Sequence, residues 1–152
     1  MDLTILLPRN HILIGLAGDN RLDIFRHLAE PLVDDGIVTD LDGFVGDLER
    51  REDEITTQVE SGIAFPHARS HAVRRLALTV GISHAEGVLF DPHVEEHCRI
   101  FFLLAVPAFA PTAHLPVLQR LANFVSDLRQ INKLLACKTP AQAVRCLLSY
   151  QD

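Results

Sequence analysis

The sequence has few cysteines and no segment long enough to cross a membrane. Its 152 residues include three cysteines, none of them in a Cys-x-x-Cys pair. Such an odd set favours free thiols in a reducing compartment over a disulfide framework. The longest apolar run, residues 100–110, contains Pro107 and is shorter than the roughly 18 residues that span a bilayer. The first ten residues, MDLTILLPRN, lack the basic segment of a secretion signal. These absences predict a cytoplasmic protein with no direct membrane insertion.

An excess of positive charge and a phosphate-binding loop are also missing. The formal net charge is −6 at pH 7, which disfavours a nucleic-acid partner held through its phosphates. No glycine-rich phosphate loop is present, so direct use of a nucleotide is not expected. The chain has no internal repeat or low-complexity tract, and its length is that of one domain with a single substantial core.

What is present is an alternation of short apolar segments with amphipathic ones. Compact apolar runs rich in β-branched residues predict strands, and apolar residues at helical spacing behind a capping side chain predict helices. Strands are expected at residues 11–18, 62–65, 76–82 and 99–106, the last covered on both faces because it shows no polar alternation. Helices are expected from Asp19 or Asn20 to Gly36, from Thr39 or Asp40 to residues 49–53, over 113–128, and over 140–148 behind Thr139.

Two of these helices have apolar stripes that predict which side chains they bury. In the first helix the predicted set is Leu22, Phe25, Leu28, Ala29, Leu32 and Val33. In the helix over 113–128 it is Leu115, Leu118, Leu121, Ala122, Val125 and Leu128. Strands alternating with such helices indicate an α/β domain with its sheet between helical layers.

His67 is the first candidate for chemistry, because it directly follows an apolar strand and a proline. Neutral imidazole is a competent nucleophile near pH 7, since its ordinary pKa is about 6.5. Pro66 has a fixed φ and restricts Phe65, so His67 is expected to leave the strand end in one direction, where α/β sheets bind ligands. A histidine in a turn after an edge strand, with no chemical role, fits the same pattern.

Other polar residues could assist His67, each with a purely structural alternative. His114 precedes a leucine-rich helix, where free backbone N–H groups can meet an anion and disfavour a charged ring. A polar residue that merely starts the helix would look the same. Arg51 closes the second helix, where a cation suits the helix dipole without any function. On physical grounds alone, Arg50 could equally take the functional or the structural role. The arginines near His67 in sequence are expected to be mostly solvated surface charges: Arg69, Arg74 and Arg75.

A metal site at DPHVEEHC, residues 91–98, is a weaker alternative. His93 and His97 are four residues apart and would share a metal if they lay on a helix. Pro92 and the strand that follows instead indicate a loop or hairpin. A nucleophilic Cys–His pair is not favoured either, because each cysteine lies in an apolar segment typical of core packing. No metal site is therefore predicted.

Two stretches carry a resemblance to a known family. The first, residues 51–68, combines Arg-Glu, a later Thr and the motif GIAFPHA, and the second is HLPVLQRLANF at 114–124. Between them, GVLFD at 87–91 precedes an apolar strand. These segments resemble the active-site and second-histidine stretches of type 2 enzyme IIA domains, the fructose–mannitol family of the bacterial phosphoenolpyruvate-dependent phosphotransferase system. The resemblance extends over residues 6–148.

The resemblance implies phosphoryl carriage. His67 would accept a phosphoryl group on Nε2 from the phosphohistidine of an HPr-like phosphocarrier protein and pass it to a IIB partner, as a protein-histidine phosphotransferase. His114 matches the second active-site histidine of the family, and Arg51 matches the arginine that steadies the phosphorylated state. No metal or nucleotide cofactor is implied, because the donor already carries an activated N–P bond. Such a transfer depends mainly on positioning and on stabilising the charge of the moving group.

The output of such a domain stays open at the level of sequence. No IIB or membrane IIC segment accompanies it here, which favours the nitrogen-type regulators, although one subunit of a split sugar transporter would look the same. The alternative function is thus a non-transport regulatory module whose phosphorylation state controls protein partners. A domain that has lost its chemistry is disfavoured, because His67, His114 and Arg51 are all present. We predict a single α/β domain over residues 1–152, with a mixed, mostly parallel β-sheet sandwiched between α-helices.

Overall fold

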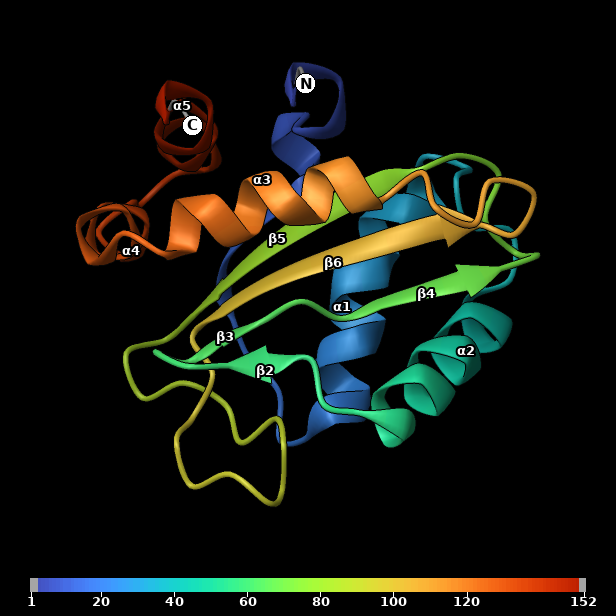
Figure 1. Ribbon diagram of the computed structural model, residues 1–152, viewed down its shortest axis with the longest axis horizontal. Helices are drawn as coiled ribbons and strands as arrows, with labels where there is room; N and C mark the ends of the chain where they lie inside the picture. The colour runs from blue at the N-terminus through green and yellow to red at the C-terminus, as the bar shows by residue number, and fades with distance from the viewer. Residues whose placement is uncertain (1–2, 151–152) are drawn as a thin grey trace.

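The computed structural model describes residues 3–150 and shows one mixed β-sheet between helices (Figure 1). The predicted α/β class and the mostly parallel sheet are confirmed. The strands are β1 (Ile12–Leu16), β2 (Gln58–Val59), β3 (Ile63–Ala64), β4 (His67–Ser70), β5 (Ala77–Ser83) and β6 (Ile100–Pro107). The helices are α1 (Arg21–Asp34), α2 (Leu41–Glu54), α3 (Leu115–Val125), α4 (Leu128–Leu135) and α5 (Pro140–Ser149), and two 3₁₀ turns, η1 (Thr4–Leu6) and η2 (Arg9–His11), precede β1.

The central strand β6 organises the sheet. The strand order is β1-β5-β6-β3-β2, and β4 also pairs with β6. β3 and β4 both run parallel to β6 along the same edge, and they keep one register, with Ala64 opposite Phe101 and His67 opposite Leu104. They are therefore two halves of one strand, interrupted at Phe65 and Pro66; this two-residue interruption is called the pause below.

Helices cover both faces of β6, whose eight residues are all buried, as predicted for 99–106. Phe101 and Leu103 pack into a core with α1 and α2, whereas Phe102 and Leu104 pack into a second core with α3, α4 and α5. Figure 1 shows α1 on one side of the sheet and α3 on the other. This alternation explains why the sequence of β6 shows no polar face.

The predicted helix starts are confirmed by their caps. The side chain of Asn20 accepts a hydrogen bond from the backbone N–H of Asp23, and Asp40 accepts one from Gly43. Thr139 caps α5 in the same way. Each cap satisfies a backbone N–H that has no partner within its own helix.

The predicted helix over 113–128 is two helices. α3 ends at Val125, and a new helix, α4, starts at Leu128 behind Asp127, whose side chain accepts a hydrogen bond from the N–H of Arg129. The prediction was wrong because the apolar spacing continues through the break. Asp127 adopts extended backbone angles there and restarts the helix in a new direction.

The predicted apolar stripe of the 113–128 segment was right only in part: Leu121 is buried, and Leu118 and Val125 pack half-buried against the core. Leu115 and Leu128 are 49% and 62% exposed, whereas Val117, Leu121 and Phe124 are buried against the sheet. The apolar residues of this segment form two overlapping stripes along the helix. The stripe that packs on the sheet is the one that includes the large ring of Phe124, because it buries more apolar surface. In α1, the predicted core residues Leu22 and Val33 are likewise exposed.

The structure also bears on the expectations about membrane insertion and disulfide bonds. Within the described residues, no helix is both long and apolar enough to cross a membrane. The three cysteines are free thiols, with Cys98 buried and Cys137 and Cys146 half-buried, as expected from their odd number.

Candidate functional site

His67 lies at the pause in the edge strand and is the first residue of β4. The expectation that it leaves a strand end is therefore corrected: the ladder resumes at His67, opposite Leu104. Pro66 cannot donate to a ladder, but its carbonyl accepts a hydrogen bond from the N–H of Leu104 at 2.9 Å. The backbone of His67 is thus held by the central strand, while its side chain is half-buried.

The ring of His67 has a defined orientation. Its Nδ1 lies 2.8 Å from the carbonyl oxygen of Phe65. Because a carbonyl oxygen only accepts hydrogen bonds, Nδ1 carries the proton and Nε2 keeps its lone pair. Burial lowers the pKa of His67, and the charges of Arg51 and Arg69 lower it further, against the hydrogen bond to Phe65, which raises it. The ring is thus a neutral nucleophile.

The second candidate, His114, lies against the first. The chain after β6 turns back over the sheet into α3 (Figure 1), and His114 occupies the position before that helix. The two rings have centroids 5.3 Å apart and planes tilted by 32°. His114 is 2% exposed, and its Nδ1 has no hydrogen-bond partner among the described residues. Burial, followed by His67 and Arg69, lowers the pKa of His114, so this ring is also neutral.

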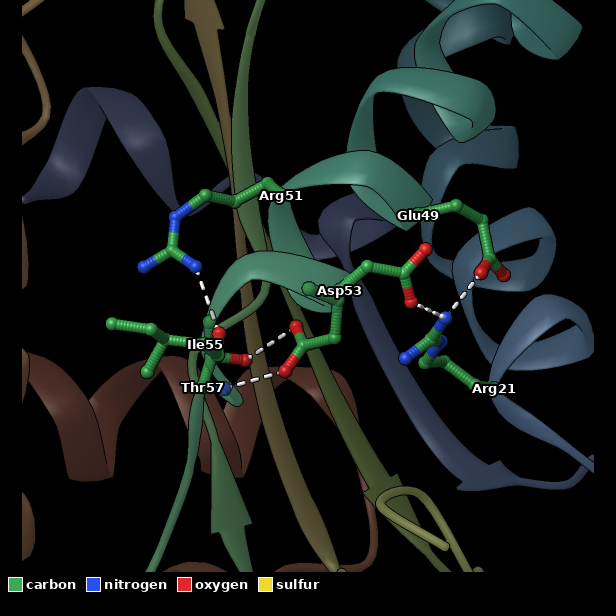
Figure 2. Close-up of polar contacts among 7 residues, drawn as sticks. Arg21, Glu49, Arg51, Asp53, Ile55 and Thr57 are labelled. Carbon is green, nitrogen blue, oxygen red and sulfur yellow. Dashed lines mark hydrogen bonds and ion pairs between the residues drawn. The ribbon is translucent and has the colours of Figure 1, made fainter.

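Arg51 is held by the end of its own helix. Its Nη1 donates to the carbonyl oxygen of Ile55 at 2.8 Å (Figure 2). Arg51 and His67 line one hollow of about 270 Å³, a size that suits a small anion. Arg50 lines this hollow too, but it is exposed and pairs with Asp47. The two arginines, which the helix-end position alone left equivalent, thus have different partners in the structure.

Arg69 is a member of this hollow that the sequence interpretation missed. It is exposed, as expected of a surface charge, but its Nε donates to the carbonyl oxygen of Pro111 at 2.6 Å. This bond holds the guanidinium in the hollow that contains His67. The signal was the spacing of the two residues, because residues i and i+2 share one face of a strand. It went unused because β4 was not predicted.

The histidines of the 91–98 stretch take no part in this site. The stretch is a loop, as predicted, closed by an isolated bridge between Val88 and Cys98. Nδ1 of His97 bonds to the carbonyl oxygen of Glu86. Within residues 3–150, no group of three or more His, Cys, Asp and Glu side chains could hold a metal ion. Burial raises the pKa of the Cys98 thiol, followed by the charge of Glu96, so this thiol is a poor nucleophile.

The sequence matches a protein-family model over residues 5–150, and the description of that family is "Phosphoenolpyruvate-dependent sugar phosphotransferase system, EIIA 2". A relative from Haloferax volcanii, the fructose-specific EIIA component of a phosphotransferase system, is 35% identical over 114 residues. That alignment covers 74% of this chain and 72% of the relative.

Solved structures show the same fold. The nitrogen regulatory protein IIA-Ntr from Neisseria meningitidis has a TM-score of 0.84 at 24% identity, over 94% of this chain and 97% of that one. A complex of enzyme IIAMTL and phosphorylated enzyme IIBMTL from Escherichia coli gives a TM-score of 0.79 at 22% identity, over 95% of this chain and 98% of the matched one.

Proposed function

Because this chain belongs to the EIIA 2 family of the phosphoenolpyruvate-dependent sugar phosphotransferase system, we propose that it is a cytoplasmic phosphoryl carrier that holds the group on His67. The donor is the phosphohistidine of an HPr-like phosphocarrier protein. The observation that carries the proposal is the geometry of His67: its Nδ1 is bonded to the carbonyl of Phe65, its Nε2 has no partner among residues 3–150, and its ring lies beside that of His114.

The transfer needs only an exchange of nitrogen atoms on phosphorus. The lone pair of Nε2 forms a new N–P bond while the N–P bond of the donor breaks. The donor ring, which carries a proton on its other nitrogen, keeps that electron pair and leaves as neutral imidazole. The proton on Nδ1 of His67 stays on its hydrogen bond to Phe65 throughout. No metal or nucleotide cofactor enters this step, because the donor is already activated.

The positive and polar groups of the hollow stabilise the moving group. A phosphoryl group in transfer carries its charge on three equatorial oxygens, so catalysis consists of positioning and electrostatic stabilisation. Arg51 and Arg69 are held by carbonyl oxygens through one N–H each, which leaves further guanidinium N–H groups for phosphoryl oxygens. The neutral ring of His114, which lies beside that of His67, supplies one more N–H donor.

The recipient that we propose is a IIB protein. One structural neighbour is seen in complex with a phosphorylated IIB enzyme, and the Haloferax relative is a fructose-specific EIIA component. A second candidate function is a regulatory one, in which the phosphorylation state of His67 controls another protein. It is favoured by the likeness to the nitrogen regulatory protein.

The proposal is tested by reconstituting the transfer. The protein is incubated with phosphoenolpyruvate, enzyme I and HPr, and an acid-labile, base-stable phosphate is sought. We expect labelling that His67→Ala abolishes, whereas persistent labelling of that variant would place the acceptor elsewhere. Adding IIB proteins then separates the two outputs: a carrier for transport loses its label to one of them, and a regulatory module keeps it.

A further inference from the structure

A buried carboxylate lies behind the site. Glu52 is on the last turn of α2 and is only 6% exposed. Both of its oxygens face Thr57: Oε2 accepts from the backbone N–H at 2.5 Å and Oε1 accepts from the hydroxyl at 2.8 Å. In Figure 2, two dashed lines from Thr57 mark these hydrogen bonds, and a separate one joins the guanidinium of Arg51 to Ile55. Glu52 therefore fixes the loop between α2 and β2.

Thr57 is in turn hydrogen-bonded to the segment that precedes His67. Its carbonyl oxygen accepts a hydrogen bond from the N–H of Phe65 at 3.1 Å. Phe65 is the residue whose own carbonyl receives the Nδ1 proton of His67. Three consecutive contacts thus connect a buried carboxylate to the nucleophilic ring, and the hydrogen bonds of the Glu52 carboxylate both go to Thr57.

We propose that Glu52 is a positioning residue, which acts through Thr57 to hold the carbonyl of Phe65 at Nδ1 of His67. Without it, the loop at 55–57 and the pause at 65–66 lose their fixed relation, and the carbonyl no longer selects one tautomer. A ring protonated on Nε2 has no lone pair there and is not a nucleophile at that atom. The kinetic part of this inference rests on the proposed function, whereas the tautomer itself does not.

The environment of Glu52 suits a structural anchor. Burial raises the pKa of Glu52, and the hydrogen bonds from Thr57, together with the charges of Arg21 and Arg51, oppose that shift. Arg21 is itself held by Glu49 and Asp53 (Figure 2), so it forms no direct bond with Glu52 that would pull the carboxylate away from Thr57.

The experiment measures the tautomer of His67 in the unphosphorylated protein, by long-range ¹H–¹⁵N correlation spectra. We expect the wild-type ring to be protonated on Nδ1. Glu52→Ala should convert it to a mixture with substantial Nε2–H. It should also lower kcat for phosphorylation by phospho-HPr on the order of 10²-fold, as for a misplaced reacting group, with an unchanged KM. Glu52→Gln should restore both readouts to within a few-fold, since its amide can accept from the N–H of Thr57 and donate to the hydroxyl.

Matched variants separate positioning from a loss of charge or of fold. Asp53→Ala removes a carboxylate from the same turn and should leave the tautomer of His67 unchanged. Thr57→Val keeps the backbone bond to Glu52 and removes the hydroxyl, so it should shift the tautomer of His67 and kcat in the same direction but by less. If Glu52→Ala does not fold, Thr57→Val is the variant that tests the positioning role.

A folded Glu52→Ala protein with the wild-type tautomer overturns the inference, even if its kcat falls. Labelling that survives His67→Ala would instead overturn the proposed function and leave the tautomer result standing.

Discussion

The rings of His67 and His114 lie with their centroids 5.3 Å apart, although one ring comes from the edge of the sheet and the other from the start of α3. Each lies in a setting that lowers its pKa, through burial first. Two neutral imidazoles side by side can act in different ways, one through a lone pair and the other through an N–H.

The role of His114 can be tested by removing its ring. His114→Ala should slow phosphorylation of His67 by roughly 10²–10³-fold, as for the loss of one transition-state donor in other enzymes. The initial rate at saturating phospho-HPr is the measurement, and His114→Gln, which keeps an N–H donor, should recover part of the loss. A rate equal to that of the wild type in His114→Ala would remove this ring from the chemistry.

The neighbouring arginines at 50 and 51 make a matched pair. Arg51→Ala should lower kcat strongly, because Arg51 lines the hollow of His67 with N–H groups left over from its one bond to Ile55. Arg50→Ala should have a much smaller effect, because Arg50 is exposed and paired with Asp47. Arg51→Lys should recover little, since an ammonium cannot reproduce the fork of a guanidinium. Steady-state rates of the three variants decide this, and equal losses at both positions would contradict it.

The activity should persist at a lower pH than an ordinary histidine allows. The nucleophile that we propose is the neutral imidazole of His67, whose pKa is lowered by burial and by Arg51 and Arg69. The rate should therefore stay level as the pH falls through about 6.5, the ordinary value, and decline only through the lower pKa in the folded protein. Arg51→Ala should move the acid limb to higher pH. A titration of the His67 ring by NMR, set beside the pH–rate profile, checks both statements.

The same shifts make the stability depend on pH. A histidine whose pKa is lower in the folded state binds fewer protons there than in the unfolded chain, so stability rises with pH. The contribution of His114 is complete above its unfolded pKa of about 6.5 and is lost as the pH falls through the folded pKa. Urea unfolding at about pH 7.5 and pH 5.5 should show a smaller acid loss for His114→Leu than for the wild type. An equal loss in the two proteins would count against this explanation.

Two glycines with the same backbone angle offer a test of the loop before β3. Gly62 and Gly36 both have φ of +71°, but a Cβ at Gly62 would lie 2.8 Å from the carbonyl oxygen of His97, whereas a Cβ at Gly36 meets nothing within 4 Å. Gly36→Ala should cost about 1–2 kcal/mol of unfolding free energy from backbone strain alone. Gly62→Ala should cost clearly more, and denaturant unfolding of both variants measures the difference. Similar costs would show that the loop adjusts freely.

The elements that could be predicted from the sequence are those specified by neighbouring residues. The caps Asn20, Asp40 and Thr139 each act within three residues, and the buried strand β6 is a continuous apolar run. The break between α3 and α4 was missed because apolar spacing alone does not register a change of direction. β4 was missed because its pairing is with β6, far along the chain.

The members of the candidate site that could be predicted from the sequence are those that lie in recognisable motifs. His67, His114 and Arg51 were chosen from the sequence, and the structure brings the two rings together and places Arg51 in the hollow of His67. Arg69 was missed along with β4. The bonds of Glu52 with Thr57, and of Thr57 with Phe65, depend on a loop that folds back on its own helix, which no residue pattern specifies.

The acceptor that orients His67 belongs to the main chain, at the pause between β3 and β4. A main-chain oxygen is present whatever side chain stands at position 65, so substitutions there can alter packing against Phe102 without deleting the acceptor. Inserting or removing one residue between Ala64 and His67 is a different kind of change, since it shifts the ring relative to both the oxygen and β6. Natural variation and protein engineering at this point are therefore limited by the length of the segment more than by its composition.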